Sequence, residues 1–154
     1  MRRSPAPGYE LDDDRERIDV DAVHQFLAIE SYWGLGRSRE VVVAAIEGSI
    51  AVTGLYFHDK QVGFARVVGD GVLMAYLADV YVLIPHRRKG LGIELVRFTV
   101  EEIGMADMYW ALHTADAERL YAKFGFQRGP IGFPIMERAW RPPLRWACRP
   151  AGSG

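Results

Sequence analysis

The stretch Ala78 to Gly92 reads ADVYVLIPHRRKGLG, and it sets the expectation for the fold. An apolar run ends at Pro85, which lacks an N–H group and so cannot continue a strand ladder. The cations Arg87, Arg88 and Lys89 then lead into a segment with two glycines. Glycine lets backbone amides approach a ligand, and the first amides of a helix lack helical partners, so the pattern indicates a diphosphate site. A solvated basic turn between a strand and a helix is the alternative.

Composition limits the class of protein. The chain has 154 residues and a formal net charge of −1, which predicts one domain with no overall attraction to nucleic acid or anionic lipid. The single Cys148 cannot form an internal disulfide, and this favours a reducing compartment. The longest nearly apolar span, residues 72–84, is too short to cross a bilayer. Acidic residues also stand where a signal peptide would be apolar, so we expect a cytoplasmic protein.

The hydrophobic periodicity predicts one domain over residues 8–138 and a Pro/Arg-rich tail over residues 139–154. The expected order is β-α-α-β-β-β-α-β-α-β. Asp19 and Ser38 are expected to cap the first two helices. The expected strands are residues 9–17, 49–57, 61–68, 72–84, 108–112 and from 126 onward, and the expected helices are residues 20–27, 38–47, 91–103 and 117–124. The three strands from residue 49 to residue 84 are predicted to form an antiparallel meander.

Other phosphate motifs do not fit the glycine segment. A P-loop needs Gly-Lys-Ser/Thr, whereas Ile93 follows Gly92, and a dinucleotide fingerprint needs a third glycine where Leu95 stands. The sequence RRKGLG of residues 87–92 does match Arg/Gln-x-x-Gly-x-Gly/Ala, and AERLYAKFGF of residues 117–126 matches A-x-x-L-Y-x-K-x-G-F. These two motifs in this order resemble the GCN5-related N-acetyltransferases (GNAT).

The resemblance implies a fold and a co-substrate. The fold would be an α/β (α+β) GNAT acyl-CoA N-acyltransferase fold, in which helices flank a mixed, mostly antiparallel sheet that is splayed between its fourth and fifth strands. The implied co-substrate is acetyl-CoA, with no metal. The implied cofactor-binding residues are Val80, Tyr81, Val82, Arg87, Arg88, Lys89, Gly90, Leu91, Gly92 and Thr114. Thr114 stands where the family often has asparagine, and Pro85 lies one residue nearer the glycines than usual.

The resemblance also implies catalytic roles. Tyr121 matches the tyrosine of the second motif and would be the general acid for the leaving thiolate. Asp79 is the only charged residue in the span 72–84, and it is expected either to handle the proton of the acceptor amine or to form a structural pair with Arg66. Tyr32, Trp33 and Arg66, with Asp70 and Tyr76, would either line the acceptor pocket or serve only to pack a lid. His86 and His113 have no second ligand at metal spacing.

The acceptor stays open at this level. We expect a small-molecule amine or a peptide amine, and a monomer or homodimer, because the fold serves many acceptors and does not choose among them. A non-catalytic acyl-CoA sensor is a second hypothesis, although Tyr121 argues against it. A nucleic-acid-binding domain that uses the basic residues 86–89 is disfavoured by the near-neutral net charge.

Overall fold

The structure, a computed structural model, describes residues 1–31, 34–129 and 136. Within these residues the strands form one sheet in the order β1-β2-β3-β4-β5-β6. All neighbouring strands are antiparallel except β5 and β6, which are parallel. The strands are β1 (Arg2–Arg3), β2 (Tyr9–Asp12), β3 (Ala51–Phe57), β4 (Lys60–Gly69), β5 (Met74–Val82) and β6 (Tyr109–Ala111). This mixed, mostly antiparallel sheet confirms the predicted fold class.

The helices are short, and two of them continue as π-helical turns. They are α1 (Val20–Gln25, then Phe26–Glu30), α2 (Arg39–Glu47), α3 (Leu91–Arg97, then Phe98–Glu102) and α4 (Glu118–Tyr121). Single 3₁₀ turns cover Arg15–Arg17, Ile84–His86 and Ala122–Phe124. In the described part of the chain, no helix is both long and apolar enough to cross a membrane.

The predicted helix caps are confirmed. The Asp19 carboxylate accepts a hydrogen bond from the Ala22 amide at 2.9 Å, and the Ser38 hydroxyl accepts one from the Val41 amide at 3.4 Å. Each side chain satisfies an amide that has no helical partner, so each fixes where its helix begins. The cap at Ser38 also fixes the place of Arg37, the residue just before it.

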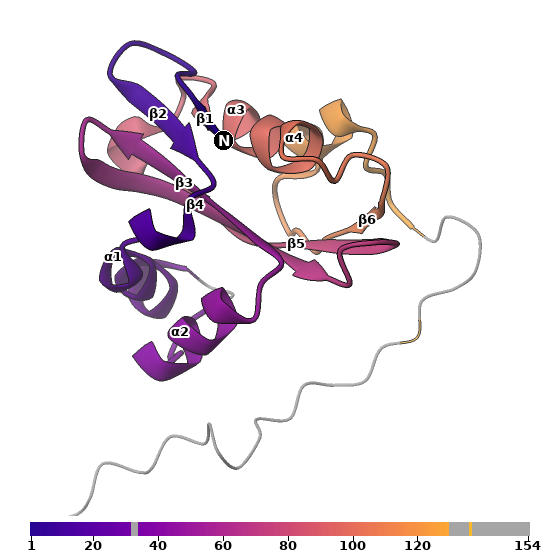
Figure 1. The fold of residues 1–154 in the computed structure, drawn as a ribbon, viewed down its shortest axis with the longest axis horizontal. Coiled ribbons are helices and arrows are strands. Elements are labelled where there is room, and N and C mark those ends of the chain that lie inside the picture. The colour runs from indigo at the N-terminus through magenta and orange to yellow at the C-terminus, as the bar shows by residue number, and fades with distance from the viewer. Residues whose placement is uncertain (32–33, 130–135, 137–154) are drawn as a thin grey trace, which may run out of the picture.

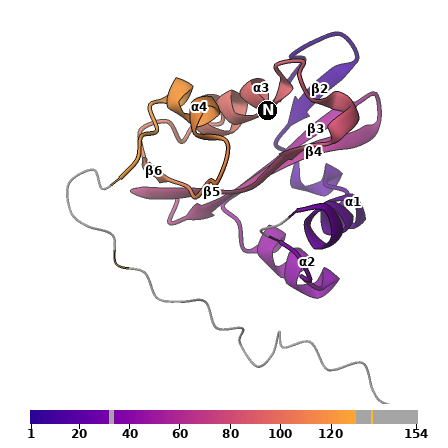
Figure 2. The same ribbon diagram turned by 180° about the vertical axis from the view of Figure 1, so that it is seen from behind.

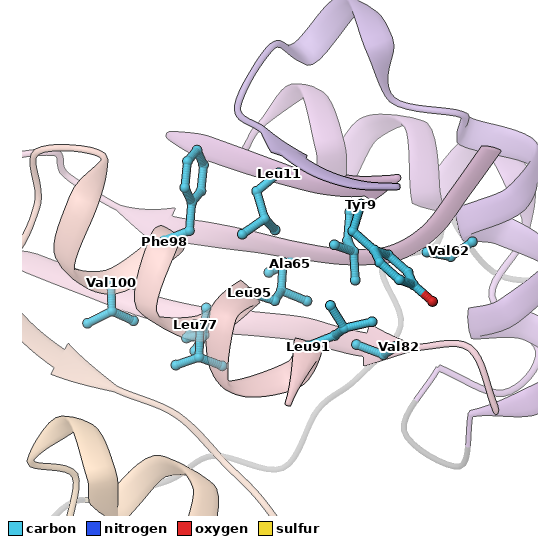
Figure 3. Packing of buried hydrophobic residues seen from close by; sticks show 12 residues of the cluster. Tyr9, Leu11, Val62, Ala65, Leu77, Val82, Leu91, Leu95, Phe98 and Val100 are labelled. Carbon is cyan, nitrogen blue, oxygen red and sulfur yellow. The ribbon is translucent and has the colours of Figure 1, made fainter. Parts of the chain in front are cut away.

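Two helical layers cover opposite faces of the sheet (Figures 1 and 2). Helices α1 and α2 bury one face, with Leu27, Val42 and Phe64 in its core. Helix α3 buries the other, where Leu91, Leu95 and Phe98 pack on apolar side chains of β2, β4 and β5 (Figure 3). Removing this apolar surface from water is the main stabilising contribution to the fold.

Strand β5 contains a bulge that the sequence did not predict. Phe64 of β4 pairs with Tyr81 and Arg66 pairs with Ala78, so Asp79 and Val80 together oppose Ala65. Asp79 has a φ of 52°, a left-handed conformation that is uncommon for a residue other than glycine. The extra residue reverses the alternation of side chains beyond it, as expected of a β-bulge.

Several predicted boundaries need correction. The strand expected at 9–17 ends at Asp12, because Asp14 accepts a hydrogen bond from the Glu16 amide and caps a 3₁₀ turn instead. The strand expected at 72–84 covers Met74–Val82, and β1 was not expected at all. Residues 126–129 form no strand. The rest of that expected strand and the tail over 139–154 lie outside the described residues, and the domain boundary at residue 138 stays a prediction.

Candidate functional site

A pocket of about 490 Å³ lies beside β5 where β6 leaves it. Strand β6 pairs only with Met74, Ala75 and Tyr76 of β5, although β5 continues to Val82. In the described ranges, no strand pairs with this edge of β5 beyond Tyr76. The pocket is lined by Arg37, Arg66, Tyr76, Leu77, Ala78, Asp79, Val80, His113, Thr114, Ala115, Asp116, Ala117 and Tyr121. An unpaired strand edge and polar side chains therefore face the same space.

The second sequence motif supplies the far wall of this pocket. Tyr121 lies on α4, is partly buried and lines the pocket. Its ring makes an edge contact with Phe126, at 6.0 Å between centroids. The Thr114 hydroxyl accepts a hydrogen bond from the Ala117 amide at 3.0 Å, which holds the turn that leads into α4. The structure thus places Tyr121 and Thr114 in one pocket with the bulge of β5.

Asp79 is held by two arginines on the near wall. Its side chain is only 3% exposed. Arg37 Nη1 lies 2.9 Å from Oδ1 and 3.1 Å from Oδ2, and Arg66 Nε lies 2.5 Å from Oδ2. The contact with Arg66 confirms the pair that was one of the two expectations for Asp79. The role of Asp79 as a base or an amine anchor stays a prediction.

Arg37 is a site residue that the sequence analysis missed. It lies 42 residues before Asp79, in the segment between the first two helices. No periodicity or short motif connects the two positions. The only signal was an arginine directly before the Ser38 cap, and a cap anchors the segment it belongs to.

The glycine segment forms a tight turn between β5 and α3. Gly90 caps α3 with a φ of 75°, and Arg88 has a φ of 61°. Arg87 Nε donates to the Val82 carbonyl oxygen at 2.7 Å, which ties the turn to the end of β5. Among the described residues, no carbonyl accepts from the amides of residues 88–92. The turn therefore offers a row of free amides beside three cations.

The space around these glycines suits a phosphate-bearing ligand. A Cβ atom built on Gly90 would have no neighbour within 4 Å, so the turn is open on that side. One built on Gly92 would lie 3.4 Å from Leu120 Cδ1, because α3 passes close to α4 there. Amides, formal positive charge and open space together fit an anion better than a neutral group.

A small hydrogen-bond network holds this turn in place. Lys89 Nζ donates to the Tyr9 hydroxyl at 3.1 Å, and that hydroxyl also lies 2.8 Å from His86 Nδ1. Burial, and secondly the charge of Lys89, lower the pKa of His86. The neutral imidazole is therefore the favoured form at neutral pH. In the described part of the chain, no three His, Cys, Asp or Glu residues gather as a metal site would require.

The remaining predicted residues divide into two groups. Val82 and residues 87–92 lie at the end of β5 and the start of α3, and they do not line the pocket. Tyr81 turns its side chain away and stacks on Phe26 at 3.9 Å, where burial raises its pKa, so only its backbone could meet a ligand. Leu91 is likewise buried in the core. Tyr32 and Trp33 lie outside the described residues.

Comparison with known proteins decides the family. Residues 37–128 match the acetyltransferase (GNAT) domain. The chain belongs to the GNAT family. A GNAT-family protein of Xanthomonas campestris has 30% sequence identity and a TM-score of 0.81, over 87% of this chain and 94% of that chain. The comparison confirms the family, and with it the assignment of this protein as an acetyltransferase.

More distant structures share the GNAT fold alone. An acetyltransferase-like protein of Deinococcus radiodurans has 22% identity and a TM-score of 0.66, over 88% of this chain and 93% of that chain. Glucosamine-6-phosphate N-acetyltransferase of Arabidopsis thaliana has 16% identity and a TM-score of 0.58, over 86% and 99%. No curated protein sequence matches significantly.

Proposed function

We propose that this GNAT protein transfers the acetyl group of acetyl-CoA to a primary amine, with Tyr121 as the general acid. The observation that carries the proposal is the pocket itself. Tyr121 and the unpaired edge of β5 at Asp79 and Val80 line one space of about 490 Å³. The glycine turn of residues 87–92 lies at the end of the same strand.

The residues that would hold acetyl-CoA fall along this strand and turn. The amides of residues 88–92, with Arg87, Arg88 and Lys89, would bind the diphosphate, because free amides and cations combine there. The backbone of Val80 and Val82 would pair with the extended arm of the cofactor as an added strand does. The Thr114 hydroxyl lies on the opposite wall. When bound, acetyl-CoA supplies the thioester that is attacked.

Different groups of the protein would carry out the separate steps of the reaction. A backbone amide between Val80 and Val82 would polarise the acetyl carbonyl, as an oxyanion hole does. As the C–N bond forms and the C–S bond breaks, Tyr121 would donate its proton to the departing sulfur. The amine must lose a proton to attack, and either Asp79 or a chain of waters in the pocket would take it.

The contacts of Asp79 favour the second of these routes for the amine proton. Both carboxylate oxygens already accept hydrogen bonds from guanidinium groups. Accepting a proton would make Asp79 a neutral carboxyl, which is a weaker acceptor for both guanidinium groups. We therefore propose that Asp79 mainly positions Arg37 and Arg66, and that water removes the proton from the amine.

A thiol-release assay tests the function. Purified protein is incubated with acetyl-CoA and with representatives of several amine classes, and free CoA thiol is measured. We expect release that depends on one class of acceptor, with an equal amount of acetylated amine. Binding of CoA without release for any acceptor would support an acyl-CoA sensor instead.

A further inference from the structure

Tyr76 and His113 meet at the pocket beside β5. The Tyr76 hydroxyl lies 2.7 Å from His113 Nδ1, and the centroids of the two rings are 5.7 Å apart. Both residues line the same space of about 490 Å³ as Tyr121. Neither of them belongs to the two sequence motifs, and neither polarising the acetyl carbonyl nor protonating the sulfur requires them. This pair of titratable side chains therefore still lacks a role.

The topology of the sheet brings these two residues together. Tyr76 is the last residue of β5 that pairs with β6, and its partner is Ala111. His113 follows two residues after Ala111, where the chain has left β6. The pair thus stands where the two strands separate and the pocket begins.

The acceptor amine brings one proton more than the reaction can use. An alkyl ammonium ion has a pKa of about 10, so at pH 7 only about one molecule in 10³ is neutral and able to attack. Imidazole is the side-chain group that takes up and releases protons near neutral pH, and carboxylates are weaker bases. Of the described residues that line the pocket, only His113 has an imidazole. The pocket therefore holds a base suited to this proton.

We propose that Tyr76 and His113 form a proton relay that receives the proton of the acceptor amine. The inference rests on the proposed acetyl transfer, and it names the group to which water passes the proton there. The ammonium ion, or the water beside it, gives a proton to the Tyr76 oxygen while the Tyr76 proton moves to His113 Nδ1. This step leaves a neutral amine, a neutral tyrosine and an imidazolium ion. His113 is exposed, so the imidazolium can pass its proton to bulk water.

The protons balance over the whole reaction. The nitrogen of a primary ammonium ion carries two protons more than the nitrogen of the product amide. The first leaves through Tyr76 and His113 before the attack. The nitrogen loses the second after the C–N bond has formed, and this proton restores the Tyr121 hydroxyl that has protonated the sulfur. One proton per turnover therefore reaches the solvent, as the conversion of an ammonium ion and a thioester into an amide and a thiol requires.

The other charged groups of the pocket affect the relay in different ways. Besides the pair, its titratable and charged side chains are those of Arg37, Arg66, Asp79, Asp116 and Tyr121. Both arginines donate to Asp79 and form with it an arginine cluster. Asp116 is exposed and lies three residues after His113, so it is the competing group for the amine proton. The test must therefore distinguish this carboxylate from the imidazole.

The pH dependence of His113→Gln tests the inference. The glutamine oxygen can still accept a hydrogen bond from Tyr76, but the amide is not a base. With a good acceptor, the kcat/KM of the parent should level off above neutral pH, and that of His113→Gln should be about 10²-fold lower at pH 7. The value for the variant should keep rising, about tenfold per pH unit up to pH 9, because it depends on the neutral amine in solution.

Three further variants separate a relay from a structural contact. His113→Ala should regain activity when free imidazole is added, after subtraction of the reaction without protein, because the site is exposed. Tyr76→Phe keeps a ring beside His113 but breaks the relay, so it should show the pH dependence of His113→Gln and carries the test if that variant does not fold. His58→Gln is the control, because His58 is exposed between β3 and β4 and does not line the pocket. It should keep the profile of the parent.

The outcomes separate this inference from the proposed function. No turnover of the parent with any amine would contradict the acetyl transfer and the relay together. Turnover with a parent-like pH profile in His113→Gln or in Tyr76→Phe would overturn the relay alone, as would loss of the plateau in Asp116→Asn instead. Nitrogen NMR of the parent gives a reading that does not depend on turnover. The neutral imidazole must lack a proton on His113 Nδ1, and a proton found there would overturn the relay whatever the kinetics.

Discussion

At the scale of single residues, a substitution at Tyr121 can separate the binding of CoA from the catalytic step. Its ring contacts Phe126, and phenylalanine would keep that contact while removing the hydroxyl. A positioned acid typically contributes about 10²- to 10⁴-fold to the rate. Tyr121→Phe should therefore lower kcat by that order and leave the Kd for CoA nearly unchanged. Steady-state kinetics with a good acceptor and calorimetry with CoA measure the two effects.

Two other results would change the role of Tyr121. A kcat within about threefold of the parent would mean that another group, or water, protonates the sulfur. A fall in CoA affinity as large as the fall in rate would mean that the hydroxyl holds the cofactor. The thermal stability of the variant, measured beside that of the parent, shows how far the hydroxyl also contributes to the fold.

Asp79→Asn tests the function of the arginine cluster. The amide cannot accept from two guanidinium groups as a carboxylate does, so it leaves a larger positive charge beside an apolar core. We expect the free energy of unfolding to fall by about 3 kcal/mol, in line with broken buried pairs. The shape of the pH–rate profile between pH 6 and 9 should stay the same. Loss of an ionisation from this profile would instead restore Asp79 as the base.

The site residues that could be predicted from the sequence lie in or beside a short motif. Tyr121 was found because it belongs to a short motif and Thr114 because it stands three residues before that motif, and both line the pocket. The left-handed conformation of Asp79 could not be predicted, because nothing near it in the sequence departs from an ordinary buried strand. Arg37 was missed because its contact with Asp79 is set by the packing of α2 on the sheet.

At the scale of elements, local chemistry predicted where helices begin better than where strands end. Asp19 and Ser38 cap their helices as expected, since a cap depends on residues within one turn. The end of β2 depended on whether Asp14 would cap a turn or continue the strand. Other strand ends depend in addition on pairing with distant residues, which hydrophobic periodicity does not report.

The turn before α3 gives a prediction about cofactor binding. At 100 times its Kd, CoA should stabilise the parent by about 2.7 kcal/mol, which corresponds to a rise in Tm of about 5–10 °C. Gly90→Glu should abolish this rise, because the carboxylate would occupy the place expected for the diphosphate. Differential scanning fluorimetry with CoA and with NAD measures the effect, and NAD should give a much smaller rise.

The matched control for this prediction is Gly90→Ala. Both variants place a side chain at a φ of 75°, so both should lose about 1–2 kcal/mol of stability. Only the glutamate adds negative charge. If alanine abolishes the CoA effect as fully as glutamate, the conformation of the turn matters rather than its charge. An unchanged effect in Gly90→Glu would contradict the diphosphate site.

At the scale of the whole molecule, the hydrophobic periodicity of the sequence was enough to predict the two helical layers and most of the sheet. The apolar faces of residues 20–27 and 91–103 predicted two helices, and in the structure these helices cover opposite faces of the sheet (Figure 1). The edge strand β1 was not predicted. Its two residues, Arg2 and Arg3, carry no β pattern, and they are held by charged side chains of other elements.

Asp12 connects this edge to the stability of the molecule at low pH. Its side chain is 3% exposed, accepts from the Asp14 amide at 3.1 Å, pairs with Arg2 at 2.9 Å and contacts Arg17. Burial alone would raise the pKa of Asp12, but the hydrogen bonds from Arg17 and the Asp14 amide and the charge of Arg2 lower it. A carboxyl with a lowered folded pKa stabilises the protein above its unfolded pKa and loses this effect as pH falls through the folded pKa.

Asp12→Asn should therefore lower the free energy of unfolding at pH 7 by about 1–3 kcal/mol, as expected for lost hydrogen bonds to charged groups. The difference from the parent should stay constant from pH 7 to about 5 and shrink as pH falls below about 4, because the unfolded parent takes up a proton at Asp12 there before the folded parent does. Urea unfolding at several pH values measures it. Asp21→Asn is the control, because Asp21 is 77% exposed and its pair with Arg39 should contribute within about 0.5 kcal/mol. A difference for Asp12→Asn that persists unchanged at pH 3 would show that its charge does not act through these partners.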